Sequence, residues 1–117
     1  MGCVIQVTKS LFTASYLCLK KLPIMKNIKE LLQDPKATIL DVRSPMEYQS
    51  GHIEGAVNIP VDEIAYRIDE LKALTPPFIL YCRSGARSSM AAHYMMQAGF
   101  TEVYNAGGLA DMRILTM

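Results

Sequence analysis

Short apolar runs with the character of β-strands alternate with helix-like segments along the chain, and this alternation limits the folds open to it. Each run is rich in β-branched or aromatic residues, which is typical of a buried strand. Strands are expected at 38–42 (TILDV), 78–82 (FILYC) and 101–105 (TEVYN), with a brief one near Ala56–Asn58. Because strands that alternate with helices form parallel sheets, we expect an α/β domain: a central, mainly parallel sheet with helices on both faces.

Helices are expected in the segments between these strands. In 61–74, four apolar residues fall on one stripe of an amphipathic helix: Val61, Ile64, Ile68 and Leu71. The other helices are expected at 26–33, at 87–98 with Gly99 as the C-terminal cap, and beyond the turn AGGLADM at 106–112. Residues 43–60 hold turn-forming residues throughout, so we expect loops there apart from the brief strand.

Composition narrows the functional classes. With 117 residues, half of them hydrophobic, the chain suits one compact domain. Its net charge of +1 gives no argument for nucleic-acid binding, and no apolar run is long enough for a transmembrane helix, so neither nucleic acid nor membrane is expected as a partner. Three cysteines without metal-type spacing favour a reduced setting, expected to be the cytoplasm, with the periplasm left open.

Residues 1–24 stand apart from the regular pattern that follows them. They are apolar, with no charge before Lys9, yet they meet the criteria for a secretory signal or a lipidation site only in part. We expect an N-terminal extension, either a strand packed on the domain or a stretch that precedes a natural start at Met25. The domain itself is expected to span 25–117.

Cys82 ends an apolar strand and begins the stretch YCRSGARS, which opens into a helix. If the chain turns sharply there, the backbone amides of Arg83, Ser84, Gly85, Ala86, Arg87 and Ser88 surround the sulfur. Such a ring beside a helix N-terminus stabilises a thiolate and binds anions. Gly85 permits the turn, and Arg87 can hold an anionic substrate through two parallel hydrogen bonds. The alternative is a buried structural cysteine before an ordinary turn; the order of strand, cysteine, glycine, arginine and helix favours a reactive thiol.

Three segments resemble, in order and spacing, the motifs of the single-domain rhodaneses. They are LDVRSPMEYQSGHIEGAVNIP (40–60), YCRSGARS (81–88) and GFTEVYNAGG (99–108). The resemblance covers about residues 26–112. It implies the rhodanese-like fold and a sulfurtransferase in which Cys82 takes sulfane sulfur from thiosulfate or a persulfide and passes it, as a persulfide, to cyanide or a thiol. Residues 83–88 would form the cradling loop, and Asp41 and Arg43 would brace it from the neighbouring strand.

The resemblance also implies the partners and the absence of a cofactor. A small sulfur donor and a thiol acceptor such as thioredoxin or glutathione are expected. One position departs from the family: where it often has tryptophan, this chain has Met112, which puts the local stability of the closing helix in doubt. Two other functions stay open, a non-catalytic binding module and a phosphatase or arsenate reductase of related fold. The spacing Cys-x4-Arg disfavours the latter, because phosphatases of this kind use Cys-x5-Arg.

Most of the remaining polar and sulfur-containing residues are expected to have structural roles. His52 is expected to make a structural hydrogen bond, His93 to lie on the surface, and Glu47 to form an ion pair. Two histidines without a third ligand predict no metal. Cys3 and Cys18 are expected to be passive. The methionines at 90, 95 and 96 are expected to fill the core, with a partner surface as the alternative.

Overall fold

The computed structural model describes residues 27–117, so the expectations for residues 1–24, Cys3 and Cys18 lie outside the described part. Its sheet contains β2 (Thr38–Asp41), β3 (Val57–Asn58), β4 (Phe78–Cys82) and β5 (Val103–Gly108). The strand order is β3-β2-β4-β5, and every neighbouring pair is parallel. The α/β class and the parallel sheet expected from the sequence are confirmed.

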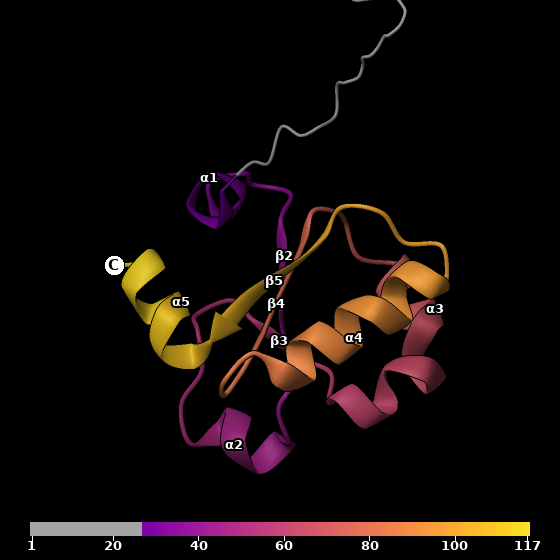
Figure 1. Cartoon of the computed structure of the whole chain (residues 1–117), viewed down its shortest axis with the longest axis horizontal. Coiled ribbons are helices and arrows are strands. Elements are labelled where there is room, and N and C mark those ends of the chain that lie inside the picture. The colour runs from indigo at the N-terminus through magenta and orange to yellow at the C-terminus, as the bar shows by residue number, and fades with distance from the viewer. Residues whose placement is uncertain (1–26) are drawn as a thin grey trace, which may run out of the picture.

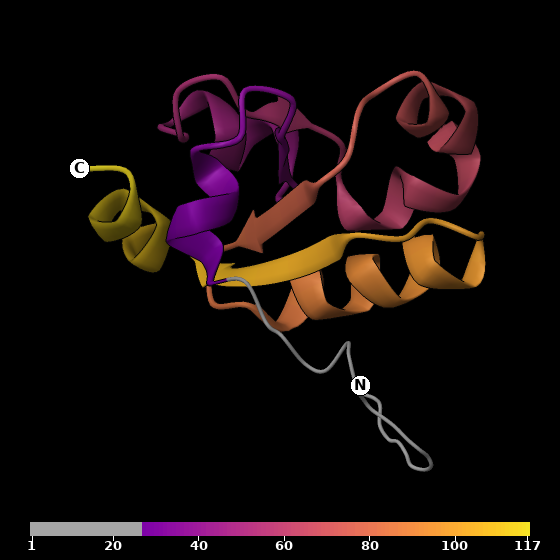
Figure 2. The same cartoon turned by 90° about the horizontal axis from the view of Figure 1, so that it is seen from above.

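Helices cover both faces of this sheet (Figure 1). The 3-10 helix η1 (Val61–Arg67), α3 (Ile68–Lys72) and α4 (Ala86–Gln97) lie on one side. On the other side lie α1 (Ile28–Leu32) and α5 (Leu109–Leu115), and α2 (Pro45–Gln49) follows β2. The perpendicular view in Figure 2 shows α4 running alongside β5.

Alternation along β4 divides the interior into two cores. Phe78, Leu80 and Cys82 point toward α4, where they pack with residues of β2, η1, α3 and α4. Ile79 and Tyr81 point toward the opposite face, where they pack with Leu31 and Met112 in a second core. Each core is continuous with one layer of helices, so the strand that carries Cys82 is buried on both sides.

The pairing of β4 with β5 is irregular at its carboxyl end. Leu80 pairs with Asn105, but two residues later Cys82 pairs with Gly108, three residues along β5. The extra residue of β5 is a bulge, which bends a strand and changes the direction of its side chains. It brings the Gly107–Gly108 pair against the residues that follow Cys82.

Two helical segments differ from expectation. The segment 61–74 is not one α-helix: residues 61–67 form η1 and only residues 68–72 form α3, although Ile64 and Leu71 are buried as expected. The helix α2 was not predicted. Its signal was present, because Ser44 and Glu47 form a capping box around Pro45, the first helical residue.

The methionines divide between core and surface. Met95 is fully buried against the sheet, whereas Met90 and Met96 are about half exposed, so the expectation of core filler is wrong for these two. Met90 and Met96 therefore lie on the part of the α4 surface that faces solvent. Met112, at the position where the family often has tryptophan, is fully buried in the second core and fastens α5 to the sheet.

Candidate active site

The Cys82 side chain lies at the carboxyl end of β4, buried under the loop that leads into α4. Cys82 is 1% exposed. Ligands of parallel sheets bind beyond the carboxyl ends of the strands, where loops and helix N-termini meet. The site therefore occupies the edge of the sheet at which this fold places reactive groups.

The chain after Cys82 folds back so that backbone amides meet the sulfur. The Gly85 N–H donates to Cys82 Sγ at 2.9 Å, and the Ser88 hydroxyl lies 3.5 Å from it. Gly85 has φ of 104°, a left-handed conformation that favours glycine, and α4 begins at the next residue. Burial opposes ionisation, but hydrogen bonds from the Ser88 hydroxyl and from the Ser88, Gly85 and Ser84 amides hold the pKa of Cys82 below its ordinary value.

The end of β5 presses on the other side of the same loop. Gly108 packs so closely that a Cβ there would overlap the Arg83 carbonyl oxygen. Asn105 Oδ1 accepts from the Ser88 hydroxyl at 2.6 Å and from the Gly107 N–H at 2.9 Å, while its Nδ2 donates to the Gly85 carbonyl at 3.1 Å. Asn105 thus joins β5, the loop and the first turn of α4, a contact that the sequence analysis did not foresee.

The Arg87 side chain pairs with Glu47 of α2. Its Nη1 and Nη2 donate to Oε1 and Oε2 of Glu47 at 2.8 and 3.0 Å. The hydrogen bonds from Arg87 and from the Ser44 N–H lower the pKa of Glu47 to about 2, and the pairing raises the pKa of Arg87. The ion pair expected for Glu47 is present, and the arginine expected to hold substrate is its partner.

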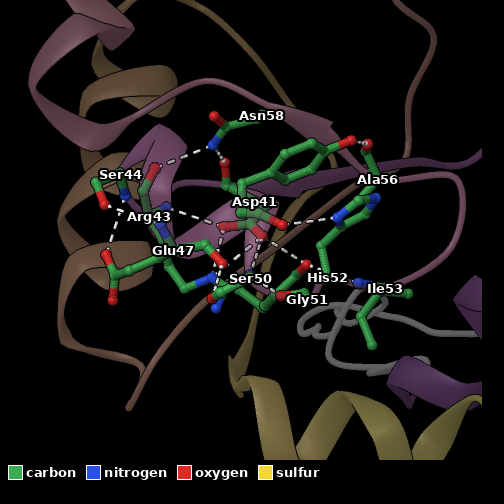
Figure 3. A network of polar contacts seen from close by, with 12 residues as sticks. Asp41, Arg43, Ser44, Glu47, Ser50, Gly51, His52, Ile53, Ala56 and Asn58 are labelled. Carbon is green, nitrogen blue, oxygen red and sulfur yellow. Dashed lines mark hydrogen bonds and ion pairs between the residues drawn. The ribbon is translucent and has the colours of Figure 1, made fainter.

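Asp41 and Arg43 lie on the opposite face of the sheet from Cys82, in a buried network (Figure 3). Arg43 Nη2 donates to Asp41 Oδ2 at 2.6 Å and to the Gly51 carbonyl at 2.7 Å, and the Tyr81 hydroxyl donates to Asp41 Oδ2 at 2.7 Å. Burial raises the pKa of Tyr81 to about 12. Because Tyr81 precedes Cys82 in β4, the network fixes the strand end rather than the loop directly.

A model of the rhodanese-like domain matches residues 25–112. The chain belongs to the rhodanese-like family. The uncharacterized protein YqhL of Bacillus subtilis is 42% identical over 73 residues, which cover 62% of this chain and 57% of YqhL. The thiosulfate sulfurtransferase PspE of Escherichia coli is 39% identical over 74 residues, covering 62% of this chain and 71% of PspE.

A solved structure described as a rhodanese with anions from E. coli shares the fold. It is 37% identical, has a TM-score of 0.58, and covers 64% of this chain and 89% of that one. The chain is thus a single rhodanese-like domain related to single-domain thiosulfate sulfurtransferases.

The structure also shows the surroundings of the other residues named from the sequence. Arg83, Ser84 and Ala86 are exposed, and Ser88 is buried. His52 donates through Nδ1 to the Tyr48 carbonyl at 2.8 Å, the structural hydrogen bond expected for it, and His93 lies exposed on α4.

Two features of the described residues, 27–117, bear on metal binding and on membrane insertion. No cluster of three His, Cys, Asp or Glu residues in that range is placed to hold a metal ion. No helix there has both the length and the apolar content needed to cross a membrane.

Proposed function

We propose that this rhodanese-like domain is a sulfurtransferase that carries sulfane sulfur as a persulfide on Cys82. One observation supports this most strongly: a sheltered sulfur that accepts a hydrogen bond from the Gly85 amide at 2.9 Å and whose pKa is lowered. A thiolate is the nucleophilic form of cysteine, so this environment favours attack by the sulfur. The kinship with thiosulfate sulfurtransferases supports the sulfane sulfur as its target.

The proposed reaction has two steps, and in each the transferred sulfur exchanges one bond for another: S–S for S–S in the first, and the Cys82 S–S bond for a bond to the acceptor, C–S with cyanide or S–S with a thiolate, in the second. The Cys82 thiolate attacks the outer sulfur of thiosulfate, the S–S bond of the donor breaks, and sulfite leaves with the electron pair. The product is a Cys82 persulfide anion. An acceptor, cyanide or a thiolate, then attacks the terminal sulfur, and the Cys82 thiolate leaves. The charge returns to the same sulfur, so the same amides serve both steps.

The roles of the surrounding residues follow from their positions. The amides of residues 83–88 would hold the negative sulfur, and exposed Arg83 would attract an anionic donor at the mouth. Asp41 and Arg43 would support β4 through Tyr81. Thioredoxin and glutathione are the acceptors we propose, because each presents a reactive thiol in a reducing compartment, and the cytoplasm is the proposed location.

Mass spectrometry of the intact protein after treatment with thiosulfate tests the central step. We expect a gain of one sulfur atom that is absent from Cys82→Ser and that is lost when cyanide is added. Absence of the adduct with thiosulfate and with organic persulfides would contradict the proposal and favour a binding module. Hydrolysis of an aryl phosphate without sulfur transfer would favour a phosphatase.

A further inference from the structure

The two arginines of the cysteine loop are not equally available to a substrate. Arg87 is engaged by both oxygens of Glu47, and its side chain is 37% exposed. Arg83 is exposed and forms no ion pair within residues 27–117. Of the two arginines in the loop, therefore, only Arg83 offers a sulfur donor a positive charge that no carboxylate of residues 27–117 balances.

Glu47 is held in place independently of Arg87. Its Oε1 accepts from the Ser44 N–H at 3.0 Å, and its own N–H donates to the Ser44 hydroxyl at 3.3 Å. This capping box fixes the carboxylate at the start of α2, so pairing requires no ordering of a mobile surface side chain. The backbone of α2 therefore holds the negative charge of Glu47 beside Arg87.

Arg87 also forms part of the wall of a cavity of about 350 Å³ between the starts of α2 and η1. Two acidic residues contribute to the same wall, Asp62 and Glu63. The remaining wall comes from Ser44 and four apolar residues: Val42, Pro45, Pro60 and Val61. Such a space offers a small organic group both apolar and polar contacts, whereas a group with several negative charges would meet the acidic side chains.

On the basis of the function proposed above, we propose that Glu47 is a specificity-determining residue that makes the site favour a singly charged organic persulfide over dianionic thiosulfate. By neutralising Arg87, it removes one of the two positive charges that a dianion would use. The organic part of the donor would lie toward the cavity, whose wall includes Arg87. The Cys82 thiolate attacks the terminal sulfur of the persulfide, the donor S–S bond breaks, and the donor thiolate leaves with the electron pair.

Glu47→Gln tests this, because glutamine also serves in a capping box while the charge is lost. Steady-state kinetics would be measured with cyanide as acceptor and with thiosulfate or cysteine persulfide as donor. We expect KM for thiosulfate to fall by about threefold or more, with KM for cysteine persulfide and both kcat values nearly unchanged. Added salt should reduce the difference in KM between variant and wild type.

Glu30→Gln is the matched control. Glu30 occupies the same position of the Asn27 capping box on α1, and it has no arginine partner within residues 27–117. We expect it to leave the ratio of the two KM values at the wild-type level. A general effect of net charge or of a weakened cap would change both variants alike, which would overturn the inference.

Loading of sulfur onto wild-type Cys82 distinguishes a wrong role for Glu47 from a wrong function for the domain. If wild-type Cys82 takes sulfur from the donors but Glu47→Gln leaves the KM ratio unchanged, or lowers kcat for both donors equally, Glu47 is structural and the inference is wrong. If neither donor loads wild-type Cys82, the proposed function falls, and the inference falls with it.

Discussion

At the scale of single residues, the Ser88 hydroxyl is one of the groups that stabilise negative charge on the Cys82 sulfur. Its one proton has three acceptors within reach: Cys82 Sγ at 3.5 Å, the Gly85 carbonyl at 3.0 Å and Asn105 Oδ1 at 2.6 Å. A thiolate is a stronger acceptor than a thiol, so ionisation should draw this proton toward the sulfur.

Ser88→Ala is therefore expected to raise the pKa of Cys82 above its value in the wild type. The rate of alkylation by iodoacetamide at neutral pH should fall several-fold, and the midpoint of its pH profile should move upward. Ser89→Ala, a change at the neighbouring exposed serine, should leave the profile in place. An unchanged midpoint in Ser88→Ala would show that the hydroxyl does not serve the sulfur.

Arg83→Ala should act through substrate attraction. Because Arg83 is exposed beside the nucleophile, we expect its loss to raise KM for thiosulfate several-fold, with a smaller effect on kcat and a weaker dependence on salt. Lys29→Ala on α1 removes the same charge at an exposed position outside the loop and serves as the control. A fall in kcat larger than the rise in KM would assign Arg83 a role in the chemical step instead.

The positions of residues near Cys82 in sequence could be predicted, while those of distant partners could not. Gly85 and Ser88 lie within six residues of the nucleophile, so the local order of strand, turn and helix determines where their groups lie. Glu47 meets Arg87 across 40 residues, and Asn105 meets Ser88 across 17. Both contacts depend on how the carboxyl ends of different strands are brought together, which local pattern does not encode.

At the scale of elements, the contact between the end of β5 and the cysteine loop predicts the effect of Gly108→Ala. The new Cβ would overlap backbone, which cannot swing aside as a side chain can. We expect a loss of about 2 kcal/mol in the free energy of unfolding and a marked loss of sulfur loading on Cys82.

A control for this prediction must destabilise the domain without touching the loop. Leu31→Ala creates a cavity under α1 in the second core and should cost about 3 kcal/mol. It should nevertheless load sulfur as the wild type does at temperatures where it is folded. Equal loading by Gly108→Ala and wild type, measured by mass spectrometry, would show that the loop tolerates the displacement.

The elements themselves were predicted unevenly for identifiable reasons. The buried strands β2 and β4 could be predicted because each is a short run of mainly apolar residues. The stripe Val61, Ile64, Ile68 and Leu71 fixed which residues of 61–74 face inward, but a spacing of three suits a 3-10 helix as well as an α-helix. Proline and serine are typical of turns, but in 43–60 one of each, Ser44 and Pro45, begins α2.

At the scale of the whole molecule, the pair between Glu47 and Arg87 links α2 to α4 and makes stability depend on pH. The pKa of Glu47 is lowered from 4.5 to about 2 by folding, so its contribution is complete above pH 4.5 and is lost as the pH falls toward 2. After allowance for partial exposure, we expect a loss of about 1 kcal/mol.

Urea unfolding of the wild type and Glu47→Gln across this interval measures the contribution. The free energy of unfolding of the variant should fall less steeply with decreasing pH, because one of the groups that gains a proton on unfolding is absent. Parallel curves for the two proteins between pH 4.5 and 2 would mean that the pair does not stabilise the fold.

The arrangement of the sheet bears on when the cysteine loop is enclosed. Parallel neighbours cannot be joined by a hairpin, so each pairing waits for a longer segment of chain to close. The strand that presses on the loop and supplies Asn105 and Gly108 is β5, the last of the four. During synthesis, a ribosome-bound chain that ends before residue 103 has Cys82 without these supports. The hydrogen-bond donors that lower the pKa of Cys82 belong to residues 84–88. What β5 adds is contact with the other side of their loop, so the site is closed from both sides only when the last strand has paired.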